Sequence, residues 1–403
     1  MGAACIESKQ PITIERGPIL RTSASAGWIA LAALNCLLLL AYLGTHPQFP
    51  GDFCAFYTGA HIYRQNPSHL YDLAAQRQVE QALVGRDDIP FNHPPYELIV
   101  WLPLAGFSFH AAFWIWRVAS LGLLAVASWL LARTLCPRIK VTAVFIIAIA
   151  FFPVPYCLWM GQDSVLLLAL FAACVWFFDQ GSDFMAGLVL GLGFFKFELV
   201  LPIAAVYFLW RRWRFLAGLL CSGVAVSAVS LAMVGSSGMV QLVELVIQGQ
   251  ASQHMAVHPV MMPNLRGMIA LVPMATPAVR TILVLILSAG LLLVAASTSS
   301  SPAPARALAS LVCFAVLASF HLNLHDFTLL LLPILVVLQD RRWTTGASWT
   351  VLVPVVALFC TPIYVVAIGE FKVAALALLV GWLWYAMSDA RKRQAPALEA
   401  AAA

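Results

Sequence analysis

Long apolar stretches recur along almost the whole chain, and they limit the possible folds more than any single motif does. Hydrophobic residues account for 62% of the sequence and charged residues for only 10%, whereas soluble domains hold about 45–50% and about 25%. A helix needs roughly 20 residues to cross the apolar core of a bilayer. The chain therefore has room for about a dozen such helices, and we expect an all-α polytopic membrane protein.

The apolar stretches predict about 12 transmembrane helices in a single domain over residues 27–388. The expected helices cover 27–43, 112–132, 142–158, 163–178, 184–195, 199–210, 214–234, 277–297, 304–320, 326–339, 346–366 and 371–387. The stretch 98–107 is bounded by prolines and is too short to cross, so it is re-entrant or interfacial. The two short stretches that flank Lys196 are either half-helices or one bent helix.

Lysine and arginine residues predict the orientation of these helices, because cytoplasmic loops carry an excess of both. With the N-terminus inside, the basic clusters all fall on the cytoplasmic side, at 133–140, 211–214, 341–342 and 391–393. Residues 1–26 and 389–403 are then cytoplasmic. The outer side receives a large first loop (44–97), a second large loop (235–276) and the turns at 161–163, 196–198 and 321–326. We therefore expect the chemistry to face the periplasm or cell exterior, from the cell (inner or plasma) membrane.

Several other classes of function are disfavoured by the same sequence. The net charge is +5, but the basic residues stand in short runs between apolar segments, as topology signals do, so we do not expect a nucleic-acid partner. The nine cysteines form no CxxC pair, and neither a zinc site nor a disulfide framework is indicated. His254 and His258 resemble a metalloprotease motif in outline, but Met255 stands where that motif requires its glutamate.

Asp52 is the first candidate for a catalytic role. It follows the first expected helix by a few residues, and a carboxylate kept near the membrane surface is costly unless it has a use. A partly desolvated carboxylate is a natural general base. The aromatic residues that follow it, among them Tyr57, suit sugar, because aromatic faces stack on sugar rings. The alternative is an interfacial loop whose aromatic residues lie at head-group level.

The segment 321–326 is the second candidate. If it is helical, His321 and His325 share one face at i and i+4, which would permit a metal site with Asp326 as a further ligand. Contact with substrate or proton handling by the histidines is a second interpretation. Helix capping by Asn323 or Asp326 is the structural alternative.

Two cations on the expected outer side are candidates for binding a phosphate. Lys196 is buried between apolar runs, and an intramembrane lysine is by default functional. Its partner is either a lipid phosphate or, in a simple ion pair, Glu198. Arg266 could hold a phosphate in bidentate fashion, or extend to the interface. Asp163 is most simply a favourable charge at a helix N-terminus.

Seven short segments, taken in order, carry a resemblance to a known family. They are Gly51–Phe53 with Phe56–Tyr57, Tyr71–Asp72, His93–Pro95 leading to Leu102–Leu104, Gly161–Gln162, Lys196 before an apolar run that ends at Arg211–Trp213, Asn264–Gly267, and His325–Asp326 before Leu329–Pro333. With these segments the chain resembles the polyprenol-phosphate-mannose-dependent mannosyltransferases of glycosyltransferase family 87, membrane enzymes of the GT-C architecture. The order and spacing agree over most of residues 27–345. Phe197 departs from the family's usual proline, and Asp163 with Ser164 departs from its usual asparagine pattern.

The resemblance implies a glycosyltransferase that moves a sugar, mannose or similar, from a polyprenyl-phosphate donor to an acceptor glycolipid or glycan on the outer face. It also implies inversion at the anomeric carbon, with no required metal and no cofactor. Asp52 matches the catalytic base, and His325 or His321 matches a histidine near the acceptor. Lys196 and Arg266 are expected to contact the donor phosphate. Expected contacts to sugar or acceptor are Tyr57, His93, Gln162 and Asp326.

A transporter or flippase of a lipid-linked or small polar substrate is the alternative function. Such proteins also have about a dozen helices, but they commonly consist of two similar halves. The chain shows no such repeat, because the first outer loop has no counterpart after residue 277. A large outer loop with carboxylates and aromatic residues favours an enzyme.

Overall fold

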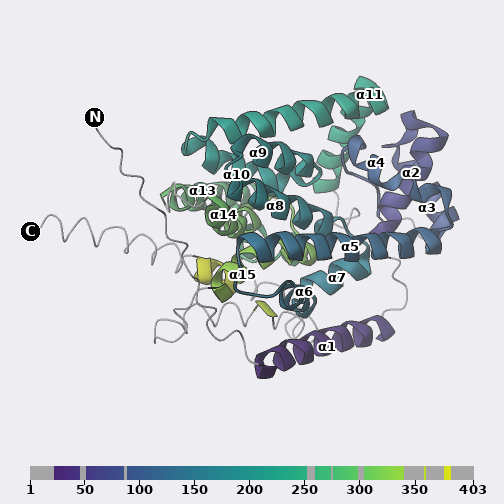
Figure 1. Ribbon diagram of the computed structural model, residues 1–403. Helices are drawn as coiled ribbons and strands as arrows, with labels where there is room; N and C mark the ends of the chain where they lie inside the picture. Colours follow the sequence, from purple (N-terminus) through teal and green to yellow (C-terminus); the bar gives the residue numbers. More distant parts are fainter. Residues whose placement is uncertain are drawn as a thin grey trace, which may run out of the picture.

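The computed structural model describes residues 22–45, 51–85, 89–251, 259–273, 276–297, 304–339, 358–359 and 376–382. Within these ranges all regular secondary structure is helical (Figure 1), which confirms the all-α expectation. Most of the expected helices 346–366 and 371–387 lies outside the described residues, as do residues 1–21 and the tail 389–403.

The described residues up to 179 supply eight α-helices and three 3₁₀ helices. The α-helices are α1 (Thr22–Thr45), α2 (Phe53–Gln65), α3 (Leu73–Val84), α4 (Leu98–Trp101), α5 (Phe109–Thr134), α6 (Val141–Ala150), α7 (Pro153–Met160) and α8 (Ser164–Asp179). The 3₁₀ helices are η1 (Pro67–His69), η2 (Pro95–Glu97) and η3 (Leu104–Gly106). The expected first outer loop is thus largely helical, because α2 and α3 lie within it.

The second half continues with helices α9 to α15. They are α9 (Asp183–Gly191), α10 (Phe197–Leu209), α11 (Trp213–Ala251), α12 (Leu265–Ala270), α13 (Pro277–Ser297), α14 (Pro304–Ala318) and α15 (Leu331–Gln339). The 3₁₀ helices among them are η4 (Leu192–Lys196), η5 (Pro259–Met261) and η6 (Leu324–Leu330).

Four helical stretches in the described residues are long and apolar enough to cross a membrane. They are Phe109–Thr134, Asp183–Leu209, Trp213–Ile247 and Pro277–Ser297, and α6 with α7 would make a fifth if that bent pair is one span. Shorter apolar helices accompany them at Gly27–Leu38, Ser164–Asp179, Ala305–Ala318 and Leu324–Gln339. This pattern is that of a membrane protein, although the expected count of about 12 spans is not reached by these criteria.

The expected helix 142–158 is broken, and the expectation of one continuous span there is wrong. Helices α6 and α7 meet at an angle of 75°. Phe151 leaves the helical region, with φ −82° and ψ 104°, and Pro153 begins α7. A proline has no N–H to donate, and inside a helix its ring would clash with the carbonyl four residues earlier, so one helix cannot continue through Pro153 and the chain bends.

The stretch that contains Lys196 folds back on itself. By length and composition residues 183–209 pass as a single span, yet Arg212 Nη1 lies 3.3 Å from Asp183 Oδ2. A continuous helix would separate those two residues by roughly 40 Å. The chain therefore runs in one direction through α9 and η4 and in the opposite direction through α10. It reverses at Lys196, where φ is −120° and ψ is 59°. Of the two alternatives, the pair of half-helices is the one observed.

The second expected outer loop, 235–276, is also more helical than expected. Helix α11 kinks at Gly235, which has φ 69° and ψ 179°, but helical structure resumes and reaches Ala251. The break comes where the apolar run ends. The continuation was missed because polar residues such as Gln241 and Glu244 interrupt the hydrophobic signal.

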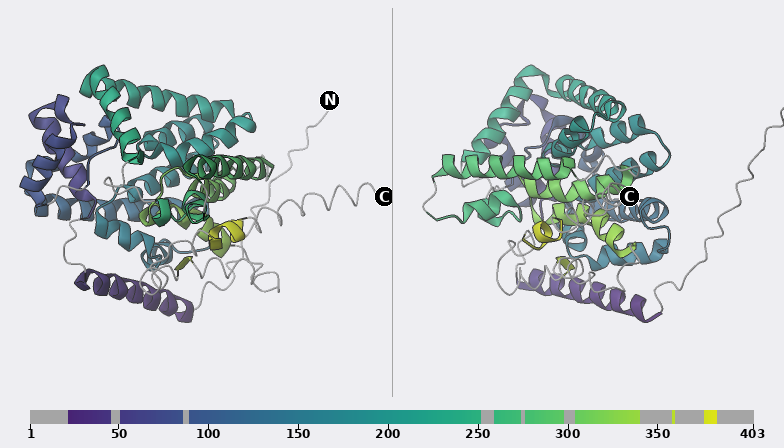
Figure 2. Two further views of the ribbon diagram at one scale, coloured as in Figure 1. Left: turned by 180° about the vertical axis from the view of Figure 1, so that it is seen from behind. Right: turned by 90° about the vertical axis from the view of Figure 1, so that its left-hand side faces the viewer.

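Two hydrophobic clusters lie side by side in the fold. The larger is built around α8, which packs against α5, α9 and α14. The smaller is aromatic and surrounds α2, with Phe53, Phe56 and Trp101 at its centre. Helix α1 packs on α6 at one edge of the molecule, and α11 lies at the opposite edge (Figures 1 and 2).

Candidate active site

Two glycine turns bring Asp52 against residues that are more than a hundred positions away. Gly51 and Gly161 both have left-handed backbones, with φ of 64° and 68°. A Cβ on Gly51 would collide with the backbone of Met160, and one on Gly161 would lie 2.7 Å from the Cβ of Phe53. Only glycine meets both requirements at each turn. The two turns therefore pack closely together.

This packing places Asp52 beside Gln162. The Gln162 side chain donates from Nε2 to Asp52 Oδ2 at 2.5 Å. Asp52 is partly exposed at the start of α2, whereas Gln162 is 6% exposed. A neutral amide donor orients the carboxylate without adding a charge to it. The sequence identified both residues but not their contact.

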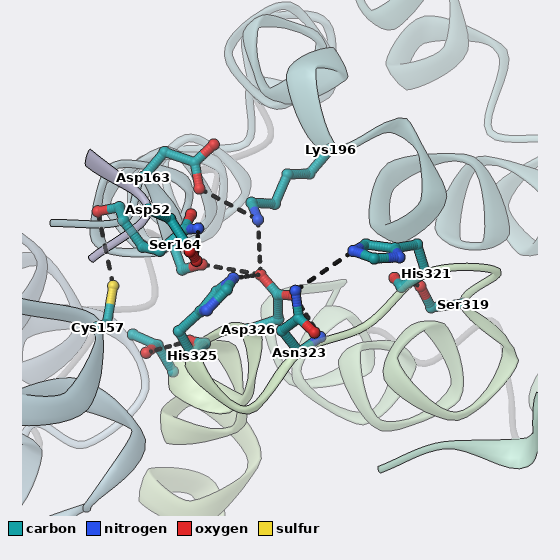
Figure 3. Close-up of polar contacts among 12 residues, drawn as sticks. Asp52, Cys157, Asp163, Ser164, Lys196, Ser319, His321, Asn323, His325 and Asp326 are labelled. Carbon is teal, nitrogen blue, oxygen red and sulfur yellow. Dashed lines mark hydrogen bonds and ion pairs between the residues drawn. The ribbon is translucent and has the colours of Figure 1, made fainter. Parts of the chain in front are cut away.

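Lys196 lies between two carboxylates, as Figure 3 shows. Its ammonium nitrogen is 3.1 Å from Asp163 Oδ1 and 2.8 Å from Asp326 Oδ1. All three side chains are buried, and Ser164 Oγ donates to Asp326 Oδ1 at 2.8 Å. The ion pair with Glu198 that the sequence offered as an alternative is thus replaced by two others. A lysine held this way ties η4 to the start of α8 and to η6.

His93 extends this group of charges on the side of η2. Its Nδ1 is 2.7 Å from Glu97 Oε2 and 3.7 Å from Asp163 Oδ2. The ring packs edge-on against Phe56 and is stacked on Phe91. Burial alone would lower the pKa of His93, but the Glu97 carboxylate and then Asp163 outweigh burial and raise this pKa to about 8.

The two histidines of 321–326 do not share a helical face, so that part of the prediction is wrong. His321 precedes the helix, because Asn323 is extended with φ −116° and ψ 168°, and η6 begins only at Leu324. Figure 3 shows His321 and His325 on different sides of Asp326. His325 Nε2 lies 3.5 Å from Asp326 Oδ1. The capping alternative is observed, since Asp326 Oδ2 accepts from the Asn323 N–H at 2.9 Å.

His321 has a different electrostatic environment from His93. Its Nε2 is 3.3 Å from the Asn323 side-chain nitrogen. Burial lowers the pKa of His321 to about 4, and the nearby Asp326 offsets only part of that effect. His321 is therefore a neutral imidazole at ordinary pH.

Arg266 and Tyr57 lie away from the buried charges. Arg266 donates from Nη1 to the Phe320 carbonyl at 2.9 Å and lies over the Phe320 ring at 4.3 Å. Its guanidinium is thus fixed just before His321. Tyr57 is 4% exposed, and its hydroxyl donates to the Phe107 carbonyl at 2.7 Å. Tyr57, an expected contact to sugar, is thus buried with its hydroxyl directed into the protein.

Glu97 is the site residue that sequence reasoning missed. It is 2% exposed, and Trp101 Nε1 donates to its Oε1 at 3.3 Å. The signal was present, since Glu97 follows His93 by four residues, and a carboxylate at the border of an apolar stretch is costly. Asp163 was noted only as a helix N-terminal charge, yet it links His93 to Lys196.

Comparison with known proteins identifies the family. The model of glycosyltransferase family 87 matches residues 91–319, which is more than half of the chain. The chain belongs to glycosyltransferase family 87. Comparisons with curated proteins and with solved structures return no match.

Membership of glycosyltransferase family 87 makes the chain a glycosyltransferase, with a sugar donor and a glycoconjugate acceptor, in agreement with its apolar helices. The family match includes His93, Gln162, Lys196 and Arg266. Asp52 and the segment His321–Asp326 lie outside it, so their place in the site depends on the contacts above.

Proposed function

We propose that this glycosyltransferase moves a sugar, mannose or similar, from a polyprenyl-phosphate donor to a glycolipid or glycan acceptor on the outer face of the membrane. The transfer is a single in-line displacement with inversion at the anomeric carbon. The new glycosidic bond forms as the bond to the lipid phosphate breaks, and the acceptor hydroxyl loses its proton to a base. The observation that carries the proposal is the partly exposed Asp52 carboxylate, oriented by Gln162 beside the buried charges.

We assign Asp52 as the base because, compared with Glu97, Asp163 and Asp326, it combines orientation with access. Glu97, Asp163 and Asp326 are each at most 2% exposed and lie in contact with His93 or Lys196. A base must reach the proton that it removes, directly or through one water molecule. His325 is 2% exposed, so we assign it and His321 to the shaping of the acceptor side.

The donor phosphate is assigned to Arg266 ahead of Lys196. A phosphate would have to compete with two carboxylates for the Lys196 ammonium. Arg266 uses one nitrogen for the Phe320 carbonyl, and a guanidinium has five N–H donors, so others can serve a phosphate. His93 remains an expected contact to sugar. Gln162 instead orients Asp52, and Tyr57 and Asp326 contact other protein groups.

We infer an outward-facing site in the cell membrane. The basic clusters support this orientation, because it keeps 133–140 and 211–214 inside. The hairpin at Lys196 supports it as well, since it returns Arg211 and Arg212 to the side of Asp183. Cysteines engineered within 64–85 and 211–214 should differ in their reaction with an impermeant reagent in intact cells, and labelling of both would contradict this orientation.

The decisive experiment compares Asp52→Asn with Asp72→Asn in purified protein given a polyprenyl-phosphate sugar donor and extracted acceptor lipids. Asparagine keeps the shape and accepts a hydrogen bond but cannot take the proton, so turnover should fall by about 10²–10⁴-fold, the usual value of a general base. Asp72 lies in the same loop, where it caps α3 by accepting from the N–H groups of Ala74 and Ala75.

Because asparagine also caps helices, Asp72→Asn should keep the wild-type rate. Near wild-type transfer by Asp52→Asn would exclude Asp52 as the base. Substrate uptake into vesicles without sugar transfer would instead favour the transporter.

A further inference from the structure

In both Glu97 and Asp163, one carboxylate oxygen contacts His93 and the other contacts a different side chain. Glu97 Oε1 accepts a hydrogen bond from Trp101 Nε1 at 3.3 Å, and Asp163 Oδ1 is 3.1 Å from Lys196 Nζ. The other oxygen of each faces His93 Nδ1, at 2.7 Å for Glu97 and 3.7 Å for Asp163. Protein metal sites are built this way, with outer partners that orient the ligands.

The three inner atoms are His93 Nδ1, Glu97 Oε2 and Asp163 Oδ2. The first two pair with each other at 2.7 Å, whereas the buried Asp163 Oδ2 has no hydrogen-bond partner in the described part of the chain. Together they form a set of ligand-type atoms that all lie within 4.8 Å of one another. An ion about 2.1 Å from each donor holds pairs of donors roughly 3–4 Å apart. Small rotations of the side chains would suffice to reach this geometry.

The local charge favours a cation. Glu97, Asp163 and Asp326 contribute three negative charges, and Lys196 contributes one positive charge, so the contacting group has a net charge of −2 while His93 is neutral. Buried charge without compensation is costly. A proton on His93 leaves a charge of −1. It also supplies a single N–H at Nδ1, which can donate to only one of two carboxylates. A divalent ion neutralises the group and contacts both carboxylates at once.

We propose that His93, Glu97 and Asp163 bind one divalent transition-metal ion. One imidazole with two carboxylates suits Mn²⁺ or Zn²⁺ better than Cu⁺ or Ca²⁺. Lys196 stays on the opposite oxygen of Asp163 and needs no displacement. Any use of the ion in transfer rests on the proposed function, where its positive charge would offset the leaving phosphate. Binding of the ion does not depend on that function.

The test uses the full chain, purified without a histidine tag, stripped with a chelator and titrated with Mn²⁺ under electron paramagnetic resonance, then challenged with Zn²⁺. We expect one Mn²⁺ per chain, displaced by Zn²⁺. His93→Gln and Glu97→Gln should each weaken binding by tenfold or more. His110 and Glu244 are exposed residues outside the group, so His110→Gln and Glu244→Gln are the matched controls and should bind as the wild type.

Two outcomes overturn the proposal. The first is the lack of saturable binding of Mn²⁺ or Zn²⁺ up to millimolar concentration, with a monodisperse, folded protein. That result would assign the group to an ion pair with protonated His93. The second is binding that neither variant weakens. Because binding is measured without substrate, a protein that binds the ion but transfers no sugar would contradict the proposed function alone. Chelator-insensitive transfer without ion binding would contradict this inference alone.

Discussion

Asp52 and Asp326 lie at two ends of one site, but their surroundings differ in kind. Asp52 is partly exposed and accepts a hydrogen bond from the neutral amide of Gln162. Asp326 is 1% exposed and contacts Lys196, the Ser164 hydroxyl and the Asn323 N–H. A carboxylate that is oriented but accessible can exchange a proton with a substrate. A carboxylate enclosed by donors serves as a fixed anion that holds three segments together.

The largest expected effect is on stability, and it comes from removing the cation that contacts Asp326. Lys196→Met keeps the apolar stem but leaves Asp163 and Asp326 facing each other without a cation, and loss of one partner of a buried ion pair costs about 3–5 kcal/mol. Thermal unfolding in detergent should show a large loss. The control is Arg212→Met at the partly exposed pair with Asp183, where at most about 1 kcal/mol is expected. Equal losses in both variants would contradict the distinction between the two pairs.

Arg266 tests the opposite side of the site, where the effect should fall on substrate binding. Arg266→Gln should weaken donor binding by about 1.5–3 kcal/mol, the value of a charge-assisted hydrogen bond. The measurement is the KM for donor at fixed acceptor. Arg280→Gln is matched, because Arg280 likewise donates to a backbone carbonyl, that of Val272. An unchanged donor KM in Arg266→Gln would return the phosphate to Lys196.

Gln162 should affect rate alone. Gln162→Leu keeps the bulk but removes the amide that orients Asp52. A hydrogen bond to a charged group contributes about 1.5–3 kcal/mol, and because Asp52 is partly exposed we expect the lower value, which is roughly tenfold in kcat. The donor KM should stay as in the wild type, and Gln162→Asn should recover part of the rate. A change in KM with constant kcat would instead identify Gln162 as a sugar contact, as the sequence first suggested.

His321 should show the smallest effect, limited to acid conditions. Its folded-state pKa of about 4 lies below the ordinary value of 6.5. The unfolded chain therefore binds the proton first, and stability falls as pH decreases from about 6.5 towards 4. His321→Gln should reduce this acid destabilisation and leave stability at pH 8 unchanged. Parallel melting curves for variant and wild type from pH 8 to pH 4.5 would contradict the buried neutral imidazole.

Much of the fold was available from apolar runs alone. The expected helix 277–297 coincides with α13, and 163–178 differs from α8 by one residue at each end. The breaks within helical runs were harder to predict. The run 142–158 is almost entirely apolar, and its bend depends on Pro153. Helix α11 beyond Gly235 was missed because its polar residues resemble a loop. Hydropathy indicates whether a helix is surrounded by apolar groups, but it does not show where the backbone bends.

The candidate site was predicted in its members and only partly in its contacts. Asp52 and Lys196 were identified because a charged group near or within an apolar run is costly and visible, whereas His93, Gln162 and Asp326 were expected from the family resemblance. Which of them touch was beyond the sequence. The contact of Lys196 with Asp326 joins positions separated by 130 residues of chain, and no local pattern encodes that distance.

The close packing of the Gly51 and Gly161 turns also has a consequence for the synthesis of the protein. Asp52 is synthesised 110 residues before Gln162. Ser164 is synthesised 162 residues before Asp326. At about 5–20 residues per second, Asp52 must wait several seconds for its amide partner and longer for the segment 321–326. A chain that stalls after its first helices therefore contains Asp52 without the residue that orients it, and under the proposed function such a chain transfers no sugar.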